Sequence, residues 1–297
     1  HSMITRSIER AQRKVEENNF GSRKRLLEYD DVMNSQREVI YTKRRHALFG
    51  ERLSIDIVNM IYDVTEGIVT QYRDENNYEG FRLELIRVFS IDAPFDQKRF
   101  QSGRIDEVVQ EIFDACYEHY QSKSATTAEK AFPVIKEVFE VNGHQIENIV
   151  VPFTDGIHGI QVVGNLKKAY DTKAKSIVTE FEKTISLTSI DDAWKEHLRE
   201  MDELKQSVQN AVYEQKDPLL IYKFESFELF KQMMIEVNRN IISFLFKGII
   251  PQEDASQVKE AAPVMRTDMR QMRTRNDDAG QYVSSSSGDV ALAEPPK

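Results

Sequence analysis

Hydrophobic side chains recur at three- and four-residue steps over residues 187–211, which places them along one side of an α-helix. The members of this stripe are Leu187, Ile190, Trp194, Leu198, Met201, Leu204, Val208 and Ala211. A second stripe with the same spacing consists of Leu220, Phe224, Phe227, Phe230, Met234, Val237, Ile241 and Phe244. Because the connection between them is short, the two stripes can bury one another only as an antiparallel helical hairpin.

The residues at the ends of the second stripe predict where its helix begins and ends. Asp217 can cap free backbone amides, and Pro218 is tolerated at the first helical position. Lys247, Gly248 and Pro251 predict the end of the helix, as a cation, a left-handed cap and a helix breaker.

Residues 4–49 are strong helix formers and predict one long helix, which would rise roughly 65 to 70 Å at 1.5 Å per residue. The apolar side chains that follow a three- and four-residue spacing in this helix are Ile8, Ala11, Val15, Leu26, Tyr29, Met33, Ile40 and Ala47. A helix of this length would serve as a spine for other units. The alternative is two helices with a break at residues 18–21, because Gly21 disfavours a helix interior.

Shorter amphipathic helices are predicted at residues 55–72, 81–89 and 105–120. Residues 166–181 are also helical in character, and we expect them to continue without a stop into the first hairpin helix.

The only convincing β signal lies at residues 147–164, where two β-branched runs flank Asp155 and Gly156 and predict a β-hairpin. A third strand is predicted at residues 138–141. The fold class is therefore mainly α, with a long scaffold helix, an antiparallel two-helix hairpin, and an inserted helical wing that carries a small antiparallel β hairpin or meander. The predicted divisions are a cloning remnant at 1–3, the long helix at 4–49, the wing at 50–168 with its β insert near 137–164, the second scaffold part with the hairpin at 169–250, and a tail or linker at 251–297.

Composition narrows the class of protein. The 297 residues carry 40% hydrophobic and 30% charged side chains and suffice for about two domains with real cores. The net charge of −9 argues against a general nucleic-acid binder. We interpret the basic triplets at 23–25 and 43–45 as solvated helix faces, although they could touch phosphates or anionic lipid. The single cysteine, Cys116, excludes an internal disulfide framework, suits a reducing cytoplasm, and is interpreted as a buried core residue.

Motifs for catalysis are absent from the sequence. There is no Gly-rich phosphate loop followed by Lys-Ser or Lys-Thr, no paired-glycine dinucleotide motif and no His-Glu-x-x-His. His197 borders the first stripe and is interpreted as a packed or solvated side chain. Glu28, Asp30 and Asp31 form an acidic cluster that we interpret as a salt-bridged face, with a functional contact as the alternative. The pattern predicts a chain that is not catalytic by itself.

Two stretches resemble the SecA family of bacterial preprotein translocase ATPases. The first, Ala-Gln-Arg-Lys-Val-Glu at 11–16 with Leu-Glu-Tyr-Asp-Asp-Val at 27–32 and Gln-Arg at 36–37, resembles the start of the family's helical scaffold domain. The second, Trp-Lys-Glu-His-Leu at 194–198 with Gln-Lys-Asp-Pro at 215–218 and Glu-Ser-Phe at 225–227, resembles its two-helix finger. The middle, about 51–168, matches only in its position as the helical wing domain.

The resemblance implies the C-terminal portion of a larger motor. The nucleotide-binding folds and the preprotein-clamp domain would lie upstream, so ATP and Mg would bind there and no cofactor would bind in this chain. The implied partners are the SecY channel complex, unfolded preproteins, the parent's own motor and clamp domains, and anionic membrane lipid. The implied location is cytoplasmic, and peripheral on the cytoplasmic face of the bacterial inner membrane. In the family the finger enters the channel mouth, presses on the translocating chain, and restrains ATP turnover.

The resemblance also assigns roles to residues. Those implied to contact the preprotein at the finger tip are Tyr213, Val212 and Gln215. Those implied to form the finger and regulatory hairpin are Trp194, His197, Leu198, Met201, Leu204, Asp217, Pro218 and Phe227. Those implied to contact the motor domains from the long helix are Arg13, Asn19, Arg23, Tyr29, Asp30, Asp31 and Arg37.

Two features depart from the family pattern, and two other functions compete. The β insert is not expected in every wing domain, and one upstream cysteine cannot form the Cys/His zinc tail in which the family often ends. The alternative functions are a non-enzymatic cytoplasmic coiled-coil scaffold protein, and an accessory region of a nucleic-acid helicase, which the acidic net charge disfavours.

Overall fold

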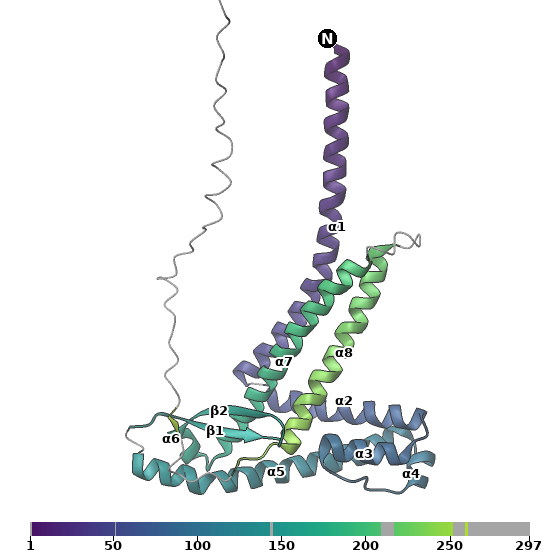
Figure 1. The fold of residues 1–297 in the computed structure, drawn as a ribbon. Helices are drawn as coiled ribbons and strands as arrows, with labels where there is room; N and C mark the ends of the chain where they lie inside the picture. The colour runs from purple at the N-terminus through teal and green to yellow at the C-terminus, as the bar shows by residue number, and fades with distance from the viewer. Residues whose placement is uncertain (1, 51, 143–144, 209–216, 252–258, 261–297) are drawn as a thin grey trace, which may run out of the picture. The chain divides into compact units, whose positions relative to one another are not determined.

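The computed structural model describes residues 2–50, 52–142, 145–208, 217–251 and 259–260. Its elements in chain order are α1 (Ser2–Phe49), α2 (Leu53–Asp74), α3 (Tyr78–Phe89), α4 (Gln97–Ser102), α5 (Ile105–Asn142), β1 (Asn148–Thr154), β2 (Gly159–Asn165), α6 (Leu166–Asp171), α7 (Lys175–Ser207), α8 (Pro218–Lys247) and β3 (Lys259–Glu260) (Figure 1). The predicted fold class, mainly α with an antiparallel helical hairpin and a small antiparallel sheet, is confirmed. The predicted domain divisions stay predictions.

The long helix α1 is continuous, so the alternative of a break at residues 18–21 is wrong. A helix-interior glycine costs about 1 kcal/mol, which the strong helix formers on both sides outweigh. Only the C-terminal part of α1 contributes to the core, through Ile40 and Ala47. Residues 3–27 are all exposed, so the predicted stripe is not buried at Ile8, Val15 or Leu26.

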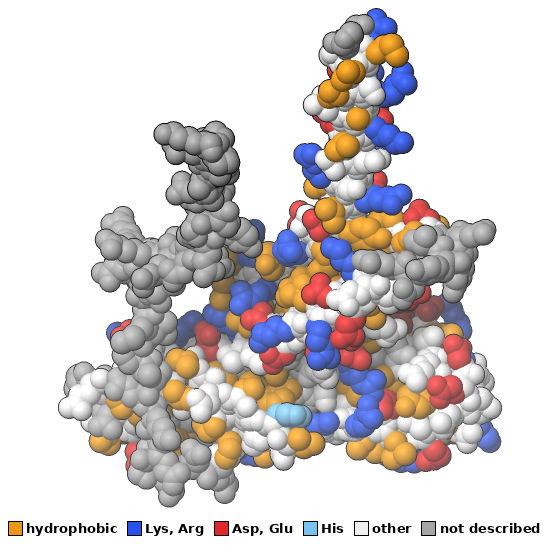
Figure 2. Space-filling view, turned by 45° about the horizontal axis from the view of Figure 1, so that its top comes forward, with side chains coloured by type: hydrophobic (Ala, Val, Ile, Leu, Met, Phe, Trp, Pro, Cys, Tyr) orange, Lys and Arg blue, Asp and Glu red, His pale blue; other side chains and the backbone are white. Residues whose placement is uncertain are grey.

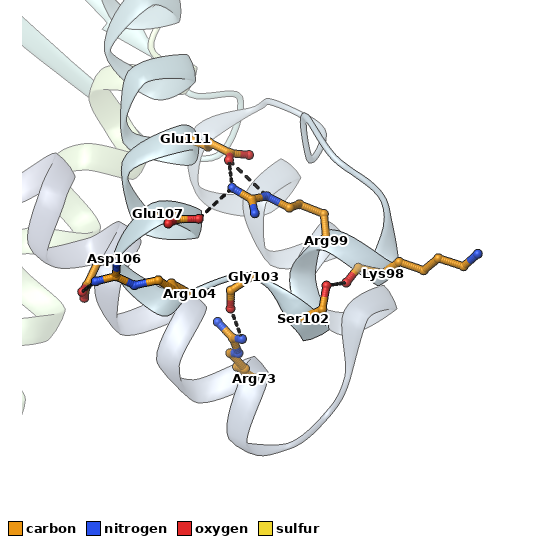
Figure 3. A network of polar contacts seen from close by, with 9 residues as sticks. All are labelled: Arg73, Lys98, Arg99, Ser102, Gly103, Arg104, Asp106, Glu107 and Glu111. Carbon is orange, nitrogen blue, oxygen red and sulfur yellow. Dashed lines mark hydrogen bonds and ion pairs between the residues drawn. The ribbon is translucent and has the colours of Figure 1, made fainter.

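The wing core forms where α2 packs against α3 and α5. Arg99 on α4, a helix that the sequence pattern did not predict, reaches Glu107 and Glu111 at the start of α5 (Figure 3). Arg73 on α2 donates hydrogen bonds to the backbone carbonyls of Gln101, at 3.0 Å, and of Gly103. These arginines hold the short α4 between α2 and α5.

Helix α5 extends far beyond the predicted residues 105–120 and passes through Pro133. The prediction of a third strand at residues 138–141 is therefore wrong. Ala128, Ala131, Ile135 and Val138 are all buried, and their spacing is that of one helical face. Burial of this face outweighs the local β preference of the β-branched and aromatic residues that end the helix.

The predicted β-hairpin is confirmed, with β1 and β2 antiparallel and paired from Asn148 with Asn165 to Thr154 with Gly159. The turn is fixed by Asp155, whose carboxylate accepts hydrogen bonds from the amides of Ile157 and His158. The other edge of β1 is paired by the backbone of β3, so the sheet order is β2-β1-β3.

The predicted helical residues 166–181 are divided between α6 and α7. Residues 175–181 continue without a stop into the hairpin helix, as predicted, but α6 does not. Lys173 and Ala174 both have a positive φ, at 51° and 65°, which ends the helical path. The Thr172 hydroxyl then accepts a hydrogen bond from the Ser176 amide at 3.1 Å, which satisfies one of the free amides in the first turn of α7. Ala174 is fully buried, so tertiary packing holds this turn in place.

Helix α8 begins and ends near the predicted residues, but its end differs in conformation. Gly248 has φ −52° and ψ 127°, so it is not the predicted left-handed cap. The chain instead leaves in an extended conformation, and Ile249 exchanges backbone hydrogen bonds with Thr154 of β1. Glycine is needed because a Cβ atom here would lie 2.8 Å from both the Phe181 ring and the Phe244 carbonyl oxygen.

Candidate functional site

The candidate site is the hairpin of α7 and α8 where it packs against α1. Its second helix starts as predicted, because the Asp217 carboxylate accepts a hydrogen bond from the Leu219 amide at 3.0 Å and Pro218 occupies the first turn. The predicted tip residues Val212, Tyr213 and Gln215 lie outside the described residues.

A small apolar cluster joins the hairpin to α1 near the tip end. Met201, Val208 and Tyr222 are buried in it, and Leu204 packs at its edge. The ring of Tyr29 on α1 lies 4.7 Å from the ring of Tyr222, centroid to centroid. Burial raises the pKa of the Tyr222 hydroxyl to about 12, so this ring stays neutral in the cluster.

A buried polar junction lies further along the same helices. The Gln36 side chain of α1 donates from Nε2 to the backbone carbonyl of Ser226 on α8, at 3.0 Å. Its Oε1 lies 2.9 Å from Nε2 of His197 on α7. Because Oε1 can only accept, this contact places a proton on Nε2 of His197. One side-chain amide thus connects both helices of the hairpin to the long helix.

His197 is the packed side chain that the sequence suggested, and not a solvated one. Only 1% of it is exposed, and its ring lies near Trp194 and Phe230, at 5.5 and 5.6 Å between centroids. Its Nδ1 atom has no hydrogen-bond partner among the described residues. Burial lowers the pKa of His197 below its usual value, so the neutral ring is the stable form.

The prediction that the α8 stripe is buried is wrong for the half of the helix nearest the tip. Leu220, Phe224 and Phe227 are exposed, with 62% of Phe227 accessible to solvent. The buried face of this half instead includes Tyr222 and Ser226, which face α1 through Tyr29 and Gln36. Both of these faces of α8 carry large hydrophobic residues. Packing against α1 buries the face that contains the polar Ser226.

The predicted contact residues on α1 are exposed to solvent, with the exception of Tyr29. Arg13, Asn19 and Arg23 lie on the exposed N-terminal part, where hydrophobic and basic side chains are interleaved (Figure 2). Asp30, Asp31 and Arg37 are also exposed, and Arg37 hydrogen-bonds Asn34 on the same helix. Tyr29 differs, because its ring packs within this chain.

Ion pairs also connect the hairpin to its surroundings. Arg44 of α1 binds both carboxylate oxygens of Asp191 on α7, at 2.8 and 2.9 Å, so this member of the basic triplet is paired and not merely solvated. Glu84 of the wing helix α3, which is buried, pairs with Arg239 of α8. The buried Gln36 junction thus lies among further polar links between α1, the wing and the hairpin.

The sequence contains a signal for this buried junction, namely polar residues at helical spacing from hydrophobic ones. Gln36 follows Met33 by three residues and precedes Ile40 by four, and Ser226 lies four residues from both Tyr222 and Phe230. A polar residue at a position of an apolar stripe is a candidate for a buried polar contact, since such groups need partners. Which partner each one finds depends on residues more than 150 positions away.

The contacts of this site among the described residues are apolar packing, hydrogen bonds and ion pairs. Among the described residues, no group of three or more His, Cys, Asp or Glu side chains is arranged to hold a metal ion. Cys116 is fully buried, as predicted, and burial raises the pKa of its thiol to about 12. None of the described helices is long and apolar enough to cross a membrane.

A long helix that carries an antiparallel helical hairpin and an inserted wing with a small sheet defines a helical scaffold class of protein. The SecA Wing and Scaffold domain model matches residues 1–248, and the chain belongs to this family. It is 52% identical to the protein translocase subunit SecA of Christiangramia forsetii over 298 residues, which cover 99% of this chain and 27% of that protein.

Two further relatives carry the same description. The protein translocase subunit SecA of Flavobacterium psychrophilum is 50% identical over 307 residues, covering 100% of this chain and 28% of that protein. That of Porphyromonas gingivalis strain ATCC 33277 is 49% identical over 288 residues, covering 94% and 26%. The chain therefore spans about a quarter of the length of these relatives.

Proposed function

We propose that this chain is the scaffold, wing and two-helix-finger region of an ATP-driven protein translocase that pushes unfolded preproteins through the SecY channel. The observation that carries this proposal is the α7–α8 hairpin held on the long helix by buried contacts, in a chain of the SecA wing and scaffold family. A hairpin held on α1 by contacts along its length can transmit a movement of α1 to its tip.

In this proposal ATP and Mg bind in motor domains of the parent protein, and the present chain regulates their turnover. The exposed part of α1, with Arg13, Asn19 and Arg23, is the proposed contact surface for those domains. Tyr213, with Val212 and Gln215, is the proposed preprotein contact. An aromatic ring suits that role because it packs on many side chains with little sequence preference.

The proposed location is the cytoplasm and the cytoplasmic face of the bacterial inner membrane, where anionic lipid is a further candidate partner. Membership of the translocase family supports this function and not the coiled-coil alternative. The pairing of the C-terminal half of α1 with its own hairpin also leaves less of its stripe for self-association.

The test is site-specific photo-crosslinking from position 213 of the full-length protein, with a secretory preprotein stalled part-way across membrane vesicles. We expect a crosslink to the stalled chain that requires both ATP and the channel. The control is the same crosslinker at Tyr62, an exposed tyrosine on the wing helix α2, which should give no such product. Crosslinks from position 213 that stay within the protein would overturn the finger function and leave a structural hairpin.

A further inference from the structure

The apolar contacts between the hairpin and α1 do not by themselves fix how far the helices slide along one another. Hydrophobic attraction is non-directional, and the flexible Met33 and Met201 in the apolar cluster adapt to different neighbours. Hydrogen bonds are directional and short-ranged, so the polar junction discriminates between positions that the apolar cluster tolerates.

Gln36 satisfies both hydrogen-bonding ends of its amide on different helices. The acceptor end meets Nε2 of His197 on α7, and the donor end meets the carbonyl oxygen of Ser226 on α8. Gln36 and His197 are both buried, with 7% and 1% of their surface exposed. A shift of either hairpin helix by one turn, about 5.4 Å, would leave at least one of these buried groups without its partner.

Nearby contacts show that the helices are aligned in one register over several turns. Lys205, Gln36 and Arg44 mark three levels of the interface between α1 and α7. At these levels Lys205 lies over the ring of Tyr29, at 5.8 Å, Gln36 meets His197, and Arg44 meets Asp191. Of these, only the Gln36 contact is buried. Water can substitute for the exposed partners after a shift, but it cannot do so inside the junction.

We propose that Gln36 is a positioning residue that holds the α7–α8 hairpin in a single register on α1 by linking His197 and Ser226 through one buried amide. Its contribution is specificity of alignment more than stability, because burying polar groups offsets much of what their hydrogen bonds contribute. If the hairpin is the proposed finger, the register of α7 and α8 on α1 sets the position of the hairpin tip. This consequence rests on the proposed function.

The register is measurable in the 297-residue chain without a channel or a nucleotide. Cysteines placed at exposed Ser35 on α1 and exposed Glu203 on α7 would carry spin labels, while the buried Cys116 stays unlabelled. Pulsed electron–electron double resonance then measures the distribution of distances between the two spin labels. The parent chain should give one narrow distribution.

The key variant is Gln36→Met, which keeps side-chain length and removes both hydrogen bonds. We expect a broadened distribution or a second one displaced by up to about 5 Å, the rise of one helical turn. The matched control is Gln12→Met on the exposed part of the same helix, which should leave the distribution unchanged. One narrow distribution in Gln36→Met would overturn the proposal and leave the finger function untouched.

A double variant separates register from the effect of an unpaired group. Gln36→Met with His197→Phe removes the imidazole that the single change leaves without its partner. We expect it to unfold at a higher denaturant concentration than Gln36→Met, while its distance distribution stays broad. A return to one narrow distribution would show that apolar packing suffices for the register, and would overturn the proposal.

Discussion

Glu84 of α3 and Arg239 of α8 form an ion pair that joins the wing to the second helix of the hairpin. The Glu84 side chain is buried, whereas that of Arg239 is about one-third exposed, and Arg87 approaches the other carboxylate oxygen at 3.3 Å. The sequence neighbours of Glu84 give no indication of this partner, because Arg239 lies on α8, which follows the wing in the sequence.

Replacing Arg239 with Met should destabilise the chain by about 2 to 3 kcal/mol, because it leaves the buried Glu84 carboxylate with only Arg87. This is less than the 3 to 5 kcal/mol expected for a fully buried pair. Urea unfolding followed by circular dichroism measures the change. Lys231→Met, at an exposed position of the same helix, is the control, and an equal effect of both variants would contradict the prediction.

The stability of the chain should fall as pH decreases below about 6.5, the ordinary pKa of histidine. Burial lowers the pKa of His197 in the folded chain, so between the two pKa values the unfolded chain binds the extra proton. His119 contributes in the same direction, because burial and then Lys123 lower its pKa. Urea midpoints between pH 5 and pH 8 measure the slope.

The control for this pH dependence is substitution at each histidine in turn. His197→Gln should reduce the slope and leave the part that belongs to His119, and His119→Gln should leave the part that belongs to His197. An unchanged slope in His197→Gln would show that the buried junction does not respond to pH.

Cys116 should resist alkylation in the folded chain at pH 8. Its thiol is buried and its pKa is about 12, so little nucleophilic thiolate is present. The reaction with a thiol reagent should become fast only when urea unfolds the wing. Rapid labelling of one thiol in the native chain, followed by absorbance, would refute this.

Two glycines should respond oppositely to alanine. Gly248→Ala should destabilise by about 1 to 3 kcal/mol, because the new Cβ would crowd the Phe181 ring and the Phe244 carbonyl oxygen. Gly21→Ala has no atom within 4 Å of its new Cβ and should stabilise α1 by up to about 1 kcal/mol. Thermal unfolding of both variants measures the pair, and an unaltered or raised midpoint in Gly248→Ala would argue against the crowding.

Element types were predictable from the sequence where the pattern was long and local. The hairpin helices, the long helix and the β1–β2 pair follow from three- and four-residue spacing, from β-branched runs, and from signals such as Asp217 and Asp155. Predictions failed where two local signals competed. Residues 138–141 favour a strand locally, but Val138 completes a helical face that the core of the chain buries.

The sequence by itself determined that this chain is a helical scaffold with a hairpin, because helical periodicity and capping are properties of neighbouring residues. Only the tertiary structure decided which face of α8 is buried, that Tyr29 packs inside the chain, and that Gln36 meets His197 and Ser226. Those outcomes depend on groups brought together from distant parts of the chain. Their physical reason is that a buried polar atom must find its partner wherever the packed helices place one.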